Sequence, residues 1–327
     1  MVLRDKGCMN SMTAHKLLFT VKLDARGHPV FTPKIFYDEP YKLIVVDEIS
    51  MLPKEMWDLI IMHKVPVIAC GDPAQLPPIG EDNGVLANPH IFLDEIMRQA
   101  QDSEIIRLTM DIRAGKPLMP FHGTDVQVIR RSEAMSNMYL WADQVICAKN
   151  KTRHWLNEQM RQMLYQTSDP LPLPGEKMIC LRNYWQEINN YETPLINGMT
   201  CTMVEAHEEK IIGNYTMPKI IRGTVVPEGY DINDIKARFY NLNMDYKIFE
   251  TGEPTINERT YQKIARGMHP KEFDFGYCIT GWKAQGSEYD KVLAFEENFP
   301  SEDIMKRRFL YTVATRAKEK LILVMKE

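Results

Sequence analysis

The chain has 327 residues, which is long enough for two domains of ordinary size. Its hydrophobic content of 44% and charged content of 26% are those of a soluble globular protein. The formal net charge of −4 excludes a globally basic surface, so any DNA contact is expected from a local groove of basic and aromatic residues.

The six cysteines are scattered along the chain and include no C-x-x-C pair. Four lie in apolar strand-like runs, which predicts buried thiols in a reducing compartment rather than disulfides or metal ligands. The amino-terminal residues MVLRDKGCMN contain no apolar signal-peptide core, and no run reaches the ~20 residues needed to cross a bilayer. A cytoplasmic protein with no membrane partner is therefore expected. The cysteines are Cys8, Cys70, Cys147, Cys180, Cys201 and Cys278.

The first 37 residues predict a helical end that stops at Gly7, a short helix through TAHKLL, and a β-hairpin over 19–37. The turn from Asp24 to Gly27 closes on glycine, which suits a type I turn followed by a left-handed residue.

The stretch from Tyr41 to Gly80 carries the strongest pattern. Leu43 to Val46 is a short, β-branched apolar run that predicts a strand covered on both faces, and it leads directly into Asp47-Glu48. Pro53 can open a helix in its first turn, and Val65 to Cys70 predicts a second strand that ends in Gly71-Asp72. A strand, a helix and a strand make a βαβ unit. Carboxylates at the carboxyl ends of parallel strands lie where open α/β sheets bind ligands, so a Mg²⁺-nucleotide site is expected here.

The remaining chain predicts a second α/β region with a β-rich segment inside it. A helix is expected over Ile91 to Ala114, then two short strands, DVQVIRR and ADQVICAKN. Asn150 is expected to cap the next helix, whose core stripe would be Trp155, Leu156, Met160, Met163 and Leu164. Residues 175–268 lack a helical period and predict a small β-barrel. DFGYCIT, KVLAF and LILVM are then predicted as strands, with a helix before the last.

Five segments, in order, resemble motifs of superfamily 1 DNA helicases, in the 5′-to-3′ branch that includes RecD-like and Dda-like enzymes. The segments are VVDEISMLP, GDPAQLPPIG, FLDEIMRQAQDSEIIRL, ITGWKAQGSEYDKVLAFE and RRFLYTVATRAKEKLILV. The resemblance spans nearly the whole chain. It implies two RecA-like parallel-sheet domains, the first incomplete, with a small SH3-like β-barrel inserted in the second. The implied bounds are 1–87 for the first domain, 88–174 with 269–327 for the second, and 175–268 for the barrel.

The resemblance also implies roles for particular residues in ATP hydrolysis with Mg²⁺. Asp47 would hold the Mg²⁺, Glu48 would deprotonate the attacking water, and Gln75 would sense the γ-phosphate. Arg98 and Arg316 would stabilise the transition state from the second domain, with a solvated surface arginine as the alternative for Arg98. The residues implied to line the domain cleft are Gln285, Gly286 and Glu288.

Single-stranded DNA is the implied partner. Thr13 and His15 are candidates to contact it, although a histidine packed on an amphipathic helix is an equal alternative. The hairpin would be the wedge that separates the strands, with Phe31 or Phe36 stacking on a base; an ordinary surface hairpin is the alternative. In the second domain the implied DNA contacts are Thr280, Trp282 and Lys283, and Trp282 stands where the family more often has histidine.

One family motif is missing from this sequence. No segment matches G-x-x-x-x-G-K-[ST], the loop whose backbone N–H groups and lysine hold the phosphates. In the resembling enzymes this loop, its helix and the following strand precede the segment with which this chain begins. A partial helicase is therefore expected, with the loop lost, outside this sequence or supplied by a separate polypeptide. The alternative is a non-catalytic DNA-binding or assembly subunit without ATP turnover.

Overall fold

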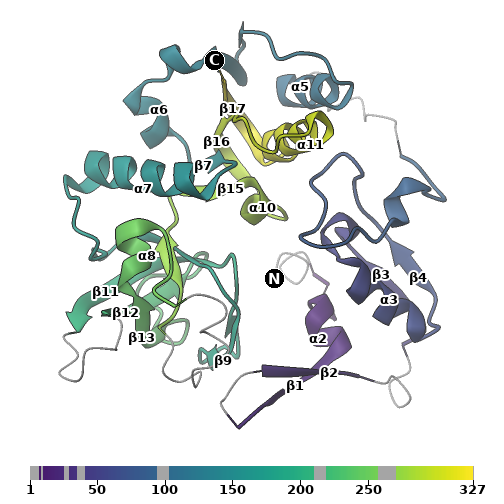
Figure 1. Cartoon of the computed structure of the whole chain (residues 1–327), viewed down its shortest axis with the longest axis horizontal. Helices are drawn as coiled ribbons and strands as arrows, with labels where there is room; N and C mark the ends of the chain where they lie inside the picture. Colours follow the sequence, from purple (N-terminus) through teal and green to yellow (C-terminus); the bar gives the residue numbers. More distant parts are fainter. Residues whose placement is uncertain are drawn as a thin grey trace. The chain divides into compact units, whose positions relative to one another are not determined.

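The computed structural model describes residues 7–8, 10–25, 29–34, 41–93, 103–209, 219–256 and 270–326 (Figure 1). They form two compact units, which are described one at a time. The first unit holds Met1–Glu95 and Ile264–Gly267, and the second holds Ile96–Lys263 and Met268–Glu327. Among the described residues, none of the helices is both long and apolar enough to span a membrane.

In the first unit, the predicted short helix and hairpin are confirmed. Helix α2 (Ala14–Leu18) leads directly into strand β1 (Phe19–Leu23), which pairs antiparallel with β2 (Pro29–Pro33). Thr13 caps α2, because its Oγ1 accepts from the Lys16 N–H at 3.3 Å.

The predicted βαβ unit is also confirmed. Strand β3 (Ile44–Val46) pairs in parallel with β4 (Val67–Ala69), and α3 (Lys54–Met62) connects them. A 3₁₀ turn, η1 (Ile49–Met51), comes between β3 and α3. A second 3₁₀ turn, η2 (Val85–Ala87), comes after β4. One hydrophobic cluster of buried side chains lies in this unit and consists of Leu18, Ile44, Ile49, Leu52, Met56 and Ile60.

The prediction that the first of these strands is covered on both faces is wrong. Ile44 is buried, but its neighbour Val45 is 62% exposed, and Ile68 of β4 is 51% exposed. Successive side chains of a strand point to opposite faces. Side chains from α2 and α3 pack with Ile44 on one face, whereas the face that carries Val45 and Ile68 is open.

In the second unit, a six-stranded sheet has the order β15-β7-β16-β17-β6-β5. All neighbouring pairs are parallel except the edge strand β5 with β6. Its central strands are buried on both faces, as parallel sheets require; Val145, Ile146 and Cys147 are each 0% exposed. The strands are β5 (Phe121–His122), β6 (Val126–Arg130), β7 (Gln144–Cys147), β15 (Cys278–Thr280), β16 (Tyr289–Phe295) and β17 (Ala317–Met325).

Helices pack on this sheet. Residues of α6 and α7 join the side chains of β7, β16 and β17 in one buried cluster, while α5 and α11 contact each other and the sheet. The helices are α5 (Glu104–Arg113), α6 (Ser136–Trp141), α7 (Asn150–Tyr165), α10 (Gly281–Ala284) and α11 (Asp303–Ala314), with a 3₁₀ turn η3 (Arg131–Glu133). The helix predicted over 91–114 is therefore confirmed only from residue 104. Residues 91–93 are not helical, and 94–102 lie outside the described residues.

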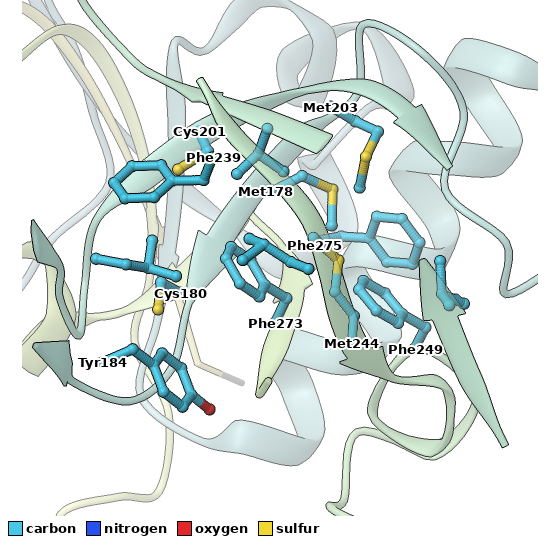
Figure 2. Close-up of a cluster of buried hydrophobic side chains, with 14 residues drawn as sticks. Met178, Cys180, Tyr184, Cys201, Met203, Phe239, Met244, Phe249, Phe273 and Phe275 are labelled. Carbon is cyan, nitrogen blue, oxygen red and sulfur yellow. The ribbon is translucent and has the colours of Figure 1, made fainter. Parts of the chain in front are cut away.

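An antiparallel sheet of order β13-β12-β11-β8-β14 lies between α7 and β15 in the sequence. Figure 2 shows its core, where aromatic and sulfur-containing side chains such as Tyr184, Phe273 and Met178 pack together. An isolated bridge joins Met244 of the outer strand β13 to Lys271, just before the other outer strand, β14. The SH3-like barrel remains a prediction. The elements are β8 (Lys177–Cys180), β9 (Tyr184–Ile188), β10 (Pro194–Leu195), β11 (Thr200–Glu209), β12 (Ile220–Pro227), β13 (Phe239–Asp245), α8 (Tyr246–Thr251) and β14 (Phe273–Phe275).

The segment DFGYCIT was predicted as one strand, and this is wrong. Phe273–Phe275 is β14 and pairs with β8 of the antiparallel sheet, whereas Cys278–Thr280 is β15 and pairs with β7 of the parallel sheet. Gly276 makes the break possible, because a Cβ there would lie 3.0 Å from the Met178 carbonyl oxygen.

The predicted cap of α7 is wrong, and its predicted core stripe is confirmed only in part, since Leu156 and Met160 are buried. Asn150 is the first helical residue, and Lys149 is the N-cap without a side-chain bond. The cap comes instead from Glu297, after β16: its carboxylate accepts from the Ala148 and Lys149 N–H groups at 2.6 and 3.0 Å. The predicted stripe also fails in part, because Trp155 and Leu164 are 47% and 45% exposed.

The buried face of α7 contains polar side chains, where Trp155 and Leu164 had been predicted. Arg153, Asn157 and Arg161 are at most 3% exposed. Each finds partners outside the helix, which a pattern within the helix cannot show.

The cysteines agree with the expectation of free thiols. None of the six is in a disulfide; Cys147, Cys180, Cys201 and Cys278 are buried, and the other two are exposed. Burial raises the pKa of the Cys180 thiol to about 12, so this side chain is an inert apolar filler at neutral pH.

Candidate nucleotide and nucleic-acid site

The acidic residues of the first unit lie at the carboxyl ends of two paired parallel strands. Asp47 and Glu48 follow β3, and Asp72 follows β4 by three residues. The two loops are bonded together, since the Ile49 N–H donates to the Cys70 carbonyl oxygen at 2.9 Å. The structure therefore brings the predicted carboxylates to one edge of the sheet.

Glu48 has an unusual backbone conformation. Its φ of 52° and ψ of 46° lie in the left-handed region, and its N–H donates to Asp47 Oδ1 at 3.0 Å. A non-glycine residue there stores strain of order 1–3 kcal/mol, and such strain is concentrated at functional sites. Asp47 is exposed and Glu48 half-buried, so both carboxylates can be reached from solvent.

Gln75 is a buried polar side chain beside these loops. It is 8% exposed, its N–H donates to the Asp72 carbonyl oxygen at 3.2 Å, and its Oε1 has no hydrogen-bond partner among the described residues. Ser50 Oγ is also buried, and it too has no hydrogen-bond partner among the described residues. Leaving a buried acceptor unpaired costs about 1–3 kcal/mol, which suits a site completed by a ligand or an ordered water.

Gly71 keeps the two loops in contact. A Cβ at this position would lie 2.7 Å from Ile49 Cγ2 and 3.2 Å from the Ile49 backbone nitrogen. We therefore expect Gly71→Ala to lower the free energy of unfolding of this unit by about 1–3 kcal/mol, the usual cost of overpacking. Urea denaturation measures the change. Cys70→Ser, at an exposed neighbour, is the control; equal stability of the two variants would contradict the expectation.

The predicted DNA-contacting residues of the first unit are only partly brought together. The His15 ring lies 6.0 Å from that of Phe31 and 6.0 Å from that of Phe19, and Phe31 is 38% exposed. Burial lowers the pKa of His15, so the ring is neutral at pH 7. Thr13 acts as the helix cap, and Phe36 lies outside the described residues.

In the second unit, Arg316 lies beside the predicted cleft-lining loop. Its Nη1 donates to the Ser287 carbonyl oxygen at 3.1 Å and its Nε to the Thr312 carbonyl oxygen at 3.0 Å. The side chain is 6% exposed. Ser287 lies between Gly286 and Glu288, so the structure brings Arg316 together with this loop. Gln285 of the same loop is 9% exposed, and Arg98 lies outside the described residues.

The predicted DNA contacts of the second unit follow β15. Thr280 is 7% exposed. Trp282 packs against Phe299 and Phe309, with ring centroids 6.0 and 6.3 Å away, so its indole is part of an aromatic cluster. Lys283 Nζ donates to Asn197 Oδ1, in the turn before β11.

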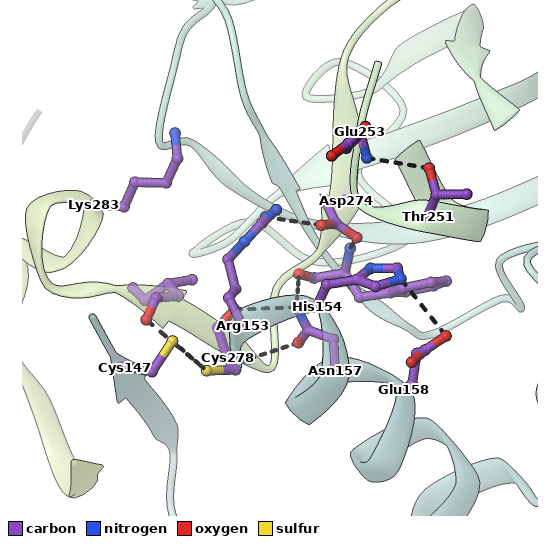
Figure 3. A network of polar contacts seen from close by, with 12 residues as sticks. Cys147, Arg153, His154, Asn157, Glu158, Thr251, Glu253, Asp274, Cys278 and Lys283 are labelled. Carbon is purple, nitrogen blue, oxygen red and sulfur yellow. Dashed lines mark hydrogen bonds and ion pairs between the residues drawn. The ribbon is translucent and has the colours of Figure 1, made fainter. Parts of the chain in front are cut away.

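A buried charged network adjoins Lys283 (Figure 3). Arg153 extends from α7 to Asp274, with 2.8 Å between Nη1 and Oδ2 and exposed fractions of 3% and 0%. Desolvation, followed by the charge of Arg153, lowers the pKa of Lys283 to about 8. Asn157 accepts from the Cys278 N–H at 2.7 Å and donates to the Phe275 carbonyl oxygen, which ties together β14 and β15.

Sequence reasoning missed this network and the Glu297 cap. The available signal was the recurrence of Arg153, Asn157 and Arg161 at intervals of four residues, one face of a helix. Their partners are not local in the sequence.

Comparisons with known proteins agree with the motif order. A model of the AAA domain matches residues 1–132, and a model of the UvrD-like helicase C-terminal domain matches residues 275–324. A helicase-type protein is the class to which these two matched segments point. These two matches and the motif order support the predicted superfamily 1 helicase family, in the 5′-to-3′ branch.

Two sequence relatives cover almost all of the chain. An uncharacterized protein of Acanthamoeba polyphaga mimivirus is 23% identical over 410 aligned residues, which cover 97% of this chain and 83% of that protein. The ATP-dependent RecD2 DNA helicase of Deinococcus radiodurans is 23% identical over 336 residues, which cover 94% of this chain. The match spans 39% of the RecD2 protein, less than half of its length.

Solved structures with a similar chain course include two Pif1 helicases. The Bacteroides Pif1 helicase in complex with ADP-AlF3 and ssDNA has a TM-score of 0.47, 16% identity, and coverage of 96% of this chain and 78% of that one. The Candida albicans Pif1 helicase has a TM-score of 0.47, 14% identity, and coverage of 86% and 71%. None of the comparisons supports a separate polypeptide that supplies the phosphate-binding loop.

Proposed function

We propose that the chain is part of an ATP-dependent DNA helicase, which couples nucleotide hydrolysis to movement on single-stranded DNA and to strand separation. One observation carries the proposal: at the carboxyl edge of a parallel strand pair, the loop with Asp47 and Glu48 is hydrogen-bonded to the loop that leads to buried Gln75, whose Oε1 has no partner among the described residues. The family assignment and the RecD2 relative, which is named an ATP-dependent DNA helicase, support it.

The donor set fits Mg²⁺ that arrives with a nucleotide. Among the described residues, no group of three or more His, Cys, Asp or Glu side chains could hold a metal ion. Mg²⁺ usually takes one or two protein carboxylates and completes its shell with water and phosphate oxygens. Asp47 would be the protein ligand, and the ion would neutralise charge on the phosphates.

The other residues would position and stabilise the reacting groups. Glu48 would take the proton of the attacking water, because its carboxylate is partly exposed on a strained, fixed backbone. Gln75 Nε2 would donate to the γ-phosphate while its unpaired Oε1 accepts from that water. Arg316, and with it Arg98, would neutralise charge that develops in the transition state. Gln285, Gly286 and Glu288 would support Arg316 in this stabilisation, because they belong to the loop whose Ser287 carbonyl oxygen accepts from Arg316.

Lys283 gives the DNA contact a pH dependence. If its ammonium binds a DNA phosphate, the contact is lost as pH rises through about 8, where Lys283 loses its proton. We expect affinity for a fluorescent oligo(dT) to fall between pH 7 and pH 9. Lys283→Arg stays charged over this range and should remove the fall. Anisotropy titrations at constant ionic strength measure both proteins, and an identical decline in the variant would contradict the role.

The test of the proposed function is ATP hydrolysis with and without oligo(dT), together with unwinding of a forked duplex. Hydrolysis that is stimulated by oligo(dT) supports the proposal. A second candidate is a DNA-binding subunit without ATP turnover; the 327 residues contain no G-x-x-x-x-G-K-[ST] segment. That candidate predicts oligo(dT) binding that is insensitive to ATP, with no hydrolysis.

A further inference from the structure

Large apolar and aromatic side chains gather on the surface formed by the β9–β10 hairpin and the β12–β13 connection. Their exposed fractions run from 36% to 63%. Exposed apolar groups that are clustered rather than scattered mark interaction sites. This tyrosine–isoleucine face consists of Ile188, Tyr191, Tyr230, Ile232, Ile235 and Tyr240.

Contacts between side chains connect the two segments of the face. The rings of Tyr191 and Tyr230 stack with centroids 5.4 Å apart and an interplanar angle of 21°. The Tyr191 hydroxyl donates to Asp234 Oδ2 at 3.0 Å, and the Tyr240 hydroxyl donates to the Ile235 carbonyl oxygen at 3.0 Å. The two segments therefore present one continuous surface rather than separate side chains.

The backbone beneath the face is held in place. The Asn190 N–H donates to the Lys236 carbonyl oxygen at 3.0 Å, and Asn189 Nδ2 donates to the Ala237 carbonyl oxygen at 2.9 Å. Asp231 and Asp234 each accept from a backbone N–H two residues later, which fixes two tight turns. A surface that is already ordered loses little conformational entropy when a partner binds.

The charge around the face argues against nucleic acid as the occupant. Residues 188–192 and 228–240 together carry four carboxylates and two cationic side chains. One of the cations, Arg238, turns its guanidinium to the Ile232 carbonyl oxygen at 2.8 Å. Phosphates would be repelled by this surplus of carboxylates, whereas a cationic protein segment would be attracted.

We propose that the tyrosine–isoleucine face docks a partner protein through a segment in which basic and large apolar residues alternate. Tyrosine and isoleucine anchors at the centre with charged groups at the rim match the composition of protein interfaces. This role goes beyond the proposed helicase activity, because none of the nucleotide or DNA residues proposed above belongs to the face. The face would attach this protein to a partner protein whether or not ATP is being hydrolysed.

The test titrates the whole chain with two synthetic 16-residue peptides of equal positive charge. One alternates Lys or Arg with Leu or Trp, and the other has Ser in place of Leu and Trp. We expect the apolar peptide to bind about tenfold more tightly or better, equivalent to about 1.4 kcal/mol. Hydrogen exchange should slow in 188–192 and 228–240 when it binds. Ile235→Glu should lower its affinity by about tenfold.

A matched control distinguishes binding at this face from nonspecific hydrophobic binding elsewhere on the protein. Ile304 of α11 is 64% exposed, against 63% for Ile235, and lies outside the face. Ile304→Glu should leave peptide binding unchanged. Four results would each overturn the proposal: equal affinity for the two peptides, equal effects of the two variants, no change in hydrogen exchange of 188–192 and 228–240 when the apolar peptide binds, or displacement of the peptide by oligo(dT). Self-association of the chain that Ile235→Glu abolishes would also overturn it, because the occupant would then be a second copy.

Discussion

Glu48→Gln is expected to lower oligo(dT)-stimulated ATP hydrolysis by about 10²- to 10⁴-fold, the usual contribution of a positioned general base. Glutamine keeps the size of the side chain and its hydrogen-bonding oxygen, but it cannot take a proton from water. Nucleotide affinity should change little, because Asp47 and the phosphate contacts are untouched. Steady-state hydrolysis and binding of a fluorescent ATP analogue measure the two effects separately.

Glu55→Gln provides the matched control for this prediction. Glu55 is an exposed carboxylate in the first turn of α3, in the same unit, and makes no proposed contact with nucleotide. Its replacement should leave hydrolysis unchanged. Retention of most of the activity in Glu48→Gln would remove Glu48 from the mechanism without affecting the family assignment.

Glu176→Ala is expected to be the most destabilising of the proposed changes, at about 3–5 kcal/mol, because it leaves a buried guanidinium without its counter-charge. Arg161 and Glu176 are 3% and 0% exposed. They form a two-bond pair, with Nε to Oε1 at 2.7 Å and Nη2 to Oε2 at 3.0 Å. The guanidinium also lies 3.9 Å above the Phe275 ring, and the Leu173 N–H donates to Glu176 at 2.7 Å.

Urea denaturation of the whole chain, with hydrogen exchange of β8 and β14 as the local readout, measures this loss. Glu176→Gln keeps the shape and should cost less than Glu176→Ala, which separates charge from packing. Asp290→Ala is the control, because Asp290 and Lys318 form an exposed pair of the kind that contributes little. A loss no larger for Glu176→Ala than for this control would show that the pair is not a major source of stability.

The sequence was most informative where the folding signal is local. The βαβ unit around Tyr41–Gly80 and the strands of the parallel sheet follow from short β-branched runs bounded by Pro, Gly and acidic residues. The β1–β2 hairpin and helix α2 before it could also be predicted because their signals are local in the sequence. The carboxylates at the strand ends could be placed together because the ends of parallel strands meet at one edge.

Errors arose where distant segments decide the outcome. An apolar run such as Leu43–Val46 predicts a strand but cannot show which layers will cover it, and Val45 is exposed. DFGYCIT reads as one strand, yet Gly276 lets it divide between two sheets. The helix 150–165 buries Arg153, Asn157 and Arg161 because their partners, Asp274, Phe275, Cys278 and Glu176, come from elsewhere in the chain.

The roles of the site residues were predictable only through resemblance. Nothing in the pattern DEISMLP alone distinguishes a catalytic glutamate from a solvated one. The left-handed backbone of Glu48 and the unpaired Oε1 of Gln75 are properties of the fold that no local pattern contains. They support a functional reading of this loop, which the Glu48→Gln experiment addresses directly.

The antiparallel sheet enters and leaves the second unit through adjacent strands. Its first strand, β8, pairs with its last, β14, through Met178 and Phe275, and the Gly276 N–H donates to the Lys177 carbonyl oxygen at 2.8 Å. A segment whose two ends lie side by side can be lengthened, exchanged or removed over evolution without moving the strands outside it. A chain with a quite different module at this position could therefore keep the same parallel sheet.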